Sequence, residues 1–93
     1  MIETFSCAET ESIFRGQRSR KFPPGILQAA RRKLIYLNEA NDLGDLRSPP
    51  GNRLEALKGH LAGSFSIRIN QQWRLCFRWK EGNALEVRII DYH

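Results

Sequence analysis

Apolar and polar residues alternate along the second half of the chain, beyond Gly63. This period of two is typical of β-strands, because successive side chains of a strand point to opposite faces of a sheet. Three such segments joined by short connections predict an antiparallel meander with one buried face. The buried face is predicted to carry Phe65, Ile67, Ile69, Trp73, Leu75, Phe77, Trp79, Leu85, Val87 and Ile89. The other face is predicted to carry Ser66, Arg68, Asn70, Arg74, Arg78, Arg88 and Tyr92.

The same alternation predicts the register of the two hairpins, since directly opposed residues of an antiparallel pair share a face. Placing apolar side chains opposite apolar ones leaves a three-residue loop in each hairpin. The opposed pairs are then Ile67–Leu75, Phe65–Phe77, Phe77–Val87 and Arg78–Glu86, and the loops are 70–72 and 81–83. The last of these pairs joins opposite charges across two strands.

The sequence of the first half of the chain predicts a short extended segment at residues 2–5, followed by a helix. Ser6 and Glu9 have the spacing of a capping box, in which each side chain bonds a free backbone N–H of the first helical turn. Gly16 suits the left-handed conformation in which helices often end. These signals predict a helix over Cys7–Arg15.

A second helix is predicted from Gly25 to about Asn41, after two prolines that are tolerated at a helix start. Its apolar positions form a helical stripe: Ile26, Leu27, Ala30, Leu34 and Leu37. The basic triplet 31–33 falls on the other side, as expected of a solvated face. Glycine and proline mark residues 42–52 as a loop, and 53–57 fit a short strand or a helical turn equally well.

We therefore expect one α+β domain over residues 1–93, with two N-terminal helices packed on one face of a twisted antiparallel sheet. No other segment is apolar enough to cover that face. The chain has no long apolar run and starts without the apolar core of a secretory signal, so a cytoplasmic protein is expected. Its two cysteines, Cys7 and Cys76, match neither a disulfide framework nor a zinc site. We expect no metal and no cofactor.

Charge adds the first indication of function. Fifteen basic residues against ten acidic ones give a net charge of +5. The basic residues concentrate between Arg47 and Arg78, where Glu55 is the one acid. A stretch of this kind favours a polyanionic partner, most often nucleic acid, although solubility alone is the alternative. The candidate RNA-binding residues are Arg53, Lys58, Arg68, Asn70 and Arg78.

Cleavage of RNA without a metal requires a base for the ribose 2′-OH, an acid for the leaving 5′-oxygen, and cations for the phosphorane oxygens. Arg74, Arg68 and Lys58 are candidates for the cations. The segment Asp91-Tyr92-His93 follows the last predicted strand and supplies titratable groups, although a frayed segment without function is the alternative. Glu55 fits either a surface ion pair or a proton carrier.

Several motifs, taken in order, resemble the HigB-type toxins of the RelE/ParE superfamily, also described as plasmid maintenance system killer proteins. The motifs are Pro49-Pro50-Gly51-Asn52-Arg53-Leu54-Glu55, Leu57-Lys58-Gly59, Ser66-Ile67-Arg68-Ile69-Asn70, Trp73-Arg74 and Asp91-Tyr92-His93. The resemblance implies a compact bacterial-ribonuclease-like fold. It also implies a ribosome-dependent mRNA endonuclease that cuts codons in the A site and leaves a 2′,3′-cyclic phosphate.

The resemblance also assigns roles to individual residues. Asp91, Tyr92 and His93 match the family's terminal catalytic segment, Arg74 matches a phosphate-contacting arginine, and Lys58 matches a basic position. Glu55 stands where some HigB toxins place a catalytic histidine, which leaves the second proton carrier open. The implied partner is a helix-turn-helix antitoxin in a heterotetrameric complex. Two alternatives remain: a ParE-like, non-enzymatic inhibitor of DNA gyrase, and a plain ribosome- or RNA-binding module.

Overall fold

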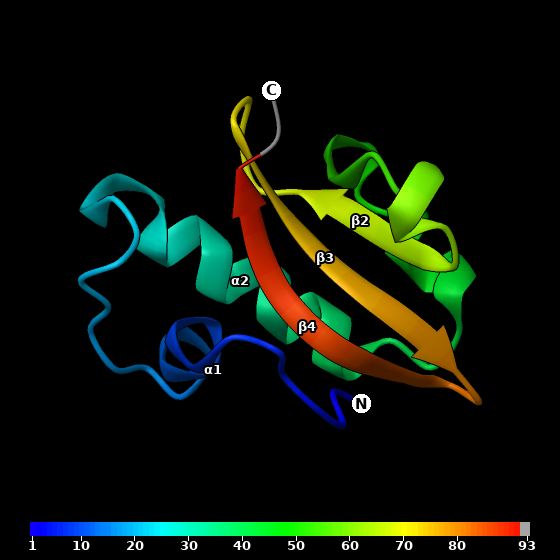
Figure 1. Cartoon of the computed structure of the whole chain (residues 1–93), viewed down its shortest axis with the longest axis horizontal. Helices are drawn as coiled ribbons and strands as arrows, with labels where there is room; N and C mark the ends of the chain where they lie inside the picture. The colour runs from blue at the N-terminus through cyan, green and yellow to red at the C-terminus, as the bar shows by residue number, and fades with distance from the viewer. Residues whose placement is uncertain (92–93) are drawn as a thin grey trace.

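The computed structural model describes residues 1–91. Its centre is a four-stranded antiparallel sheet in the order β1-β2-β3-β4, which confirms the predicted meander (Figure 1). The strands are β1 (Glu55–Ala56), β2 (Ser64–Arg68), β3 (Trp73–Lys80) and β4 (Asn83–Asp91). The ambiguous segment 53–57 therefore contributes a short edge strand. At the other edge, Ile2 and Phe5 form parallel bridges to Ala84 and Val87 of β4.

The predicted register is correct for the first hairpin and only partly correct for the second. Ile67 opposes Leu75 and Phe65 opposes Phe77 in the β2–β3 pair. In the β3–β4 pair the predicted register holds from Trp73–Asp91 to Cys76–Arg88, but beyond that point Arg78 opposes Leu85.

A β-bulge at Glu86 explains the difference. The connection is a two-residue turn at Glu81 and Gly82, both with positive φ (51° and 80°), which suits the twist of a hairpin. The resulting one-residue shift is absorbed at Glu86, whose φ is also positive at 53°. Leu85 consequently lies on the same side as Arg78 and outside the core, contrary to prediction. The Arg78–Glu86 ion pair still forms, at 3.6 Å.

Helix α1 (Ala8–Phe14) occupies the predicted segment but lacks the predicted capping box. The Ser6 hydroxyl donates to the carbonyl of Glu86 instead, because this residue is held against β4 by the extended start. The predicted stop at Gly16 is confirmed, with φ +81° and the paired backbone hydrogen bonds of a Schellman motif from residues 16 and 17.

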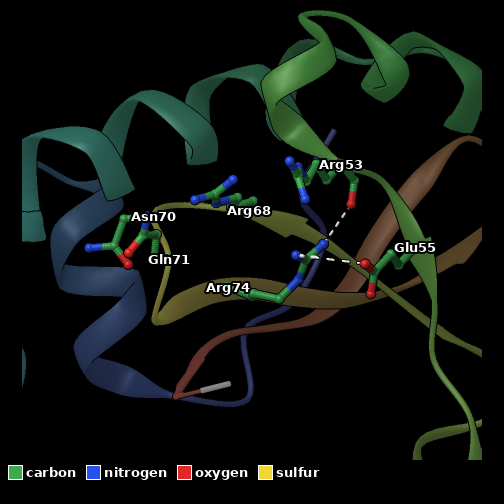
Figure 2. A pocket seen from close by; sticks show the side chains of 6 residues that line it. All are labelled: Arg53, Glu55, Arg68, Asn70, Gln71 and Arg74. Atoms are coloured by element: carbon green, nitrogen blue, oxygen red, sulfur yellow. Dashed lines mark hydrogen bonds and ion pairs between the residues drawn. The ribbon is translucent and has the colours of Figure 1, made fainter. Parts of the chain in front are cut away.

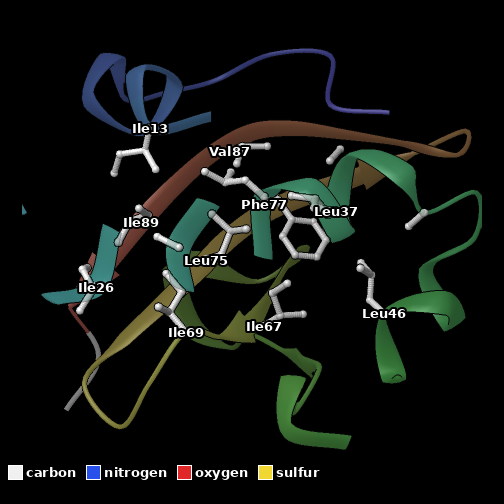
Figure 3. Close-up of a cluster of buried hydrophobic side chains, with 14 of the residues drawn as sticks. Ile13, Ile26, Leu37, Leu46, Ile67, Ile69, Leu75, Phe77, Val87 and Ile89 are labelled. Atoms are coloured by element: carbon white, nitrogen blue, oxygen red, sulfur yellow. The ribbon is translucent and has the colours of Figure 1, made fainter. Parts of the chain in front are cut away.

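Helix α2 (Leu27–Glu39) follows the 3₁₀ turn η1 (Pro24–Ile26) and confirms the second predicted helix. It runs across one face of the sheet, while α1 lies beside β4 (Figure 1). One buried cluster joins the two helices to the sheet (Figure 3). Its members include Ile13, Ile26, Ala30, Leu34, Leu37, Ile67, Ile69, Leu75, Phe77, Val87 and Ile89.

The segment between α2 and β2 was predicted as a loop up to residue 52 and instead contains short 3₁₀ helices. They are η2 (Leu43–Arg47), η3 (Pro50–Asn52) and η4 (Gly59–Leu61). Asp42 and Asp45 form a capping box at η2, which was not predicted.

None of the helices within residues 1–91 is both long and apolar enough to cross a membrane.

The two cysteines differ sharply in environment. Cys76 is fully buried on the sheet, and this burial raises the pKa of its thiol. Burial also opposes ionisation of the half-buried Cys7, but hydrogen bonds from Thr10 and the charge of Lys21 outweigh it and lower the pKa of Cys7. Since the thiolate is the nucleophile, Cys7 is more reactive near neutral pH.

We therefore expect a pulse of iodoacetamide on the native protein to alkylate Cys7 and to spare Cys76, as read by peptide mass spectrometry. As the pH is raised, labelling of Cys7 should accelerate at lower pH values than labelling of an ordinary thiol does. In urea both cysteines should react. Alkylation of Cys76 in the native protein would show that this part of the sheet opens.

Candidate nucleic-acid interface and catalytic cleft

A cleft of about 420 Å³ lies where η3 and β1 meet the β2–β3 hairpin (Figure 2). It is lined by Arg53, Glu55, Arg68, Asn70, Gln71 and Arg74. Five of these six were identified in the sequence as candidate binding or catalytic residues, and the cleft brings them together. Gln71 was missed, because as a polar residue of a hairpin loop it carries no pattern beyond solvent exposure.

Arg74 is the most constrained of these side chains. It is buried, at 7% exposure, rather than projecting from an open face. Its Nε donates to the Ser66 hydroxyl at 2.8 Å, and its Nη2 donates to the carbonyl oxygen of Arg53 at 2.6 Å. Its Nη1 lies 4.0 Å from Oε1 of Glu55 (Figure 2). These contacts fix the guanidinium plane at the cleft.

The predicted polar face of the sheet is largely covered around Arg74. Ser64, Ser66 and Cys76 are each at most 4% exposed. The cause is the η3–β1 segment, which folds over β2 and brings the Arg53 carbonyl to Arg74. The basic surface is therefore a cleft beside an edge strand and not a flat sheet.

The cleft is strongly cationic. Arg68 and Arg74 are directly opposed on β2 and β3, so their side chains leave the same face, and Arg53 joins them from the residue that follows η3. Directly opposed like charges destabilise a strand pair unless a counter-charge lies between them. Glu55 is the one acid among the lining residues, which leaves an excess of positive charge. Such a cleft is suited to a phosphate group.

Lys58 and Arg78 lie outside this cleft. Lys58 lines an adjacent hollow of about 370 Å³ together with Glu55, which borders both spaces. Arg78 lies four residues along β3 from Arg74, about 13 Å away at the strand's rise per residue. There it faces Ser64 across the strands and pairs with Glu86.

The predicted catalytic segment starts at Asp91, which does not line the cleft. Asp91 is the last residue of β4 and opposes Trp73, the neighbour of Arg74. The side-chain amide of Gln72 donates to its carboxylate at 3.1 Å. Tyr92 and His93 lie outside the described residues, so their assigned roles remain predictions.

The fold and the site together define a small α+β protein with a cationic cleft around a buried, hydrogen-bonded arginine. Comparison with known proteins places the chain more closely. Residues 4–93 match the HigB-like toxin family, described as RelE-like toxins of type II toxin–antitoxin systems. The chain belongs to this family.

Two curated relatives support the assignment. The chain is 51% identical over 77 residues to Toxin HigB-1 of Vibrio cholerae, a match covering 83% of this chain and 80% of that toxin. It is 26% identical over 93 residues to the Endoribonuclease HigB of Proteus vulgaris, with all of both chains covered.

Solved structures agree on the fold. A YafQ mutant from E. coli superimposes with a TM-score of 0.63 at 10% identity, covering 98% of this chain and 93% of that one. A chain of the YoeB–YefM complex from Staphylococcus aureus gives a TM-score of 0.62 at 20% identity, covering 100% of this chain and 98% of that one. At these identities the likeness concerns the fold alone.

Proposed function

We propose that this toxin is a ribosome-dependent mRNA endonuclease that stops translation by cutting RNA without a metal ion. The observation that carries the proposal is the arginine held at the floor of a cationic cleft with a carboxylate beside it. The name of the Proteus vulgaris relative, an endoribonuclease, supports the same activity.

The geometry suggests which residues take part in each step of RNA cleavage. A phosphate placed at the cleft meets Arg74 and Arg68, whose guanidinium groups stabilise the charge that develops on the phosphorane oxygens. The ribose 2′-oxygen attacks phosphorus while a base takes its proton. The bond to the 5′-oxygen then breaks, that oxygen receives a proton, and a 2′,3′-cyclic phosphate remains. Glu55, 4.0 Å from Arg74, and the segment 91–93 are the proposed proton carriers.

The proposal includes a partner and a setting. Family membership shows that the chain acts within a toxin–antitoxin system. We propose that the antitoxin is a helix-turn-helix protein, that the two form a heterotetramer, and that the toxin acts in the cytoplasm. An excess of positive charge at the cleft favours fast, salt-sensitive association with an acidic surface of the antitoxin.

Inducible expression tests the proposed activity directly. Protein synthesis should stop before any DNA-damage response appears, and mapping of RNA ends should show new cuts within translated codons. In vitro, the purified protein should cleave mRNA when programmed ribosomes are present. A DNA-damage response without RNA cuts would instead indicate a ParE-like gyrase inhibitor, and binding to ribosomes without either effect would indicate a binding module.

Phosphate contacts can be assigned by salt dependence. Replacing Arg68 with alanine should weaken ribosome binding and reduce the slope of log affinity against log salt by about one, because one cation at the cleft is removed. The matched change Arg78→Ala should have a smaller effect, since that guanidinium is already paired with Glu86 outside the cleft. Filter binding from low to high salt measures both slopes. Equal slopes for the two variants and the wild type would mean that the cleft is not the phosphate-binding surface.

A further inference from the structure

Asn52 is a fully buried polar side chain in a turn whose neighbouring residues are exposed. Its exposure is 0%, whereas residues 48–51 and 53 are all exposed. Burying an amide is unfavourable unless its hydrogen bonds are satisfied. Its Nδ2 donates to the carbonyl oxygens of Leu46 and Ser48, each at 3.2 Å. Its Oδ1 accepts from Nζ of Lys33 on α2.

These bonds determine the position of the next residue. Asn52 ends η3, and Arg53 follows in the left-handed conformation at φ 46° and ψ 59°, which is unusual for a residue other than glycine. This conformation turns the Arg53 carbonyl toward β3, where it accepts from Nη2 of Arg74. A continuous chain of contacts thus runs from Lys33 through Asn52 and Arg53 to Arg74.

Lys33 behaves as an anchor and not as a solvated lysine. Its neighbours Arg31 and Arg32 are exposed, whereas Lys33 is partly buried and lies over the Tyr36 ring, 5.5 Å from the ring centre. Partial burial, which disfavours the charged ammonium, and the charge of Arg32 lower its pKa. The bond to Asn52 compensates part of that cost.

We propose that Asn52, anchored by Lys33, is a positioning residue that orients Arg74 for transition-state stabilisation through the carbonyl of Arg53. The role rests on the proposed RNA cleavage. The turn itself lies on the molecular surface, since residues 48–51 and 53 are exposed. The buried amide selects the conformation that presents a carbonyl oxygen to the catalytic guanidinium.

The test is a double-mutant cycle between Asn52→Ala and Arg74→Lys, using single-turnover cleavage on programmed ribosomes. Asn52→Ala should lower the cleavage rate by up to about a hundredfold, the cost of misplacing a catalytic group by about 1 Å, while ribosome affinity stays near that of the wild type. In the Arg74→Lys background, where the guanidinium is absent, the same change should have little further effect. Additive losses would overturn the proposal.

Asn38→Ala is the matched control. The Asn38 side chain accepts a hydrogen bond from the backbone N–H of Ile2 at 3.0 Å and lies on α2, as Lys33 does, but its bond is to the N-terminal segment and not to Asn52. Asn38→Ala should lower the thermal unfolding midpoint without changing the cleavage rate.

If Asn52→Ala fails to fold, Lys33→Met takes its place, because this change removes the anchor and leaves both carbonyl contacts of Asn52. Unchanged cleavage by a folded Lys33→Met would count against the anchor.

A spectroscopic measurement tests the positioning of Arg74 independently of the proposed RNA cleavage. The Nε–H of Arg74 donates to Ser66 in a buried site, so its NMR signal should exchange slowly with water in the wild type and in Asn38→Ala. It should exchange faster in Asn52→Ala. If the wild type cleaves no RNA but this signal responds, the positioning of Arg74 stands and the ribonuclease proposal fails. An unchanged signal in Asn52→Ala would overturn the positioning role.

Discussion

Replacing Arg74 with alanine is expected to reduce RNA cleavage by about 10²- to 10³-fold, the typical cost of removing one preorganised donor from a transition-state site. The guanidinium is fixed by Ser66 and by the Arg53 carbonyl before substrate arrives. No side-chain ordering is therefore needed when charge builds on the phosphate. Single-turnover cleavage at saturating ribosome concentration measures the loss, and growth after induction should be restored in parallel.

The same change should also lower stability, because Arg74 is a structural as well as a chemical group. Its removal takes a donor away from a buried hydroxyl and a carbonyl oxygen, and each such loss typically costs about 1–3 kcal/mol. Arg74→Lys separates the two effects. It keeps the positive charge but has no planar fork to reach both Ser66 and Arg53, so cleavage should be intermediate. Full cleavage by a folded Arg74→Ala protein would remove this residue from the mechanism.

The sequence was sufficient for the faces of β2 and β3, but not for the whole of β4. Period-two alternation specifies which side chains share a face, and it located Ile67 opposite Leu75 correctly. The bulge at Glu86 was invisible, because a glutamate at positive φ leaves no glycine to mark it. Likewise Ser6 was read as a helix cap from spacing alone, whereas its hydroxyl bonds a strand that lies 80 residues away in sequence.

The candidate site shows the same division between local and long-range information. Charge and the family motifs identified Arg53, Arg68 and Arg74, yet neither could show that Arg74 is buried. That burial depends on how the η3–β1 segment folds over the sheet, where Asn52 bonds Lys33 of α2 and the carbonyl of Leu46. Asn52 was visible in the Pro-Pro-Gly-Asn motif only as a turn residue, because its partner Lys33 lies 19 residues away, on α2.

Changing His93 to glutamine is expected to lower cleavage by about 10²- to 10⁴-fold, the usual cost of losing one general acid or base. The structural motivation is that β4 ends at Asp91, which opposes Trp73, the neighbour of Arg74 in β3. Imidazole is the side chain best suited to proton transfer near neutral pH, and glutamine keeps a similar polarity without titrating. Cleavage rates from pH 5 to 9 should therefore lose one limb of the wild-type profile.

Glu55→Gln distinguishes the two proposed proton carriers on the same assay. If His93 and Glu55 act as acid and base in one step, Glu55→Gln should lower cleavage as His93→Gln does. The double change should then cost less than the sum of both, because proton transfer is already lost. Arg31→Ala, on the exposed side of α2, serves as the control that should match the wild type. A His93→Gln protein that binds antitoxin and still cleaves at the wild-type rate across this range would assign no catalytic role to His93 and would leave Glu55 and Tyr92 as the candidates.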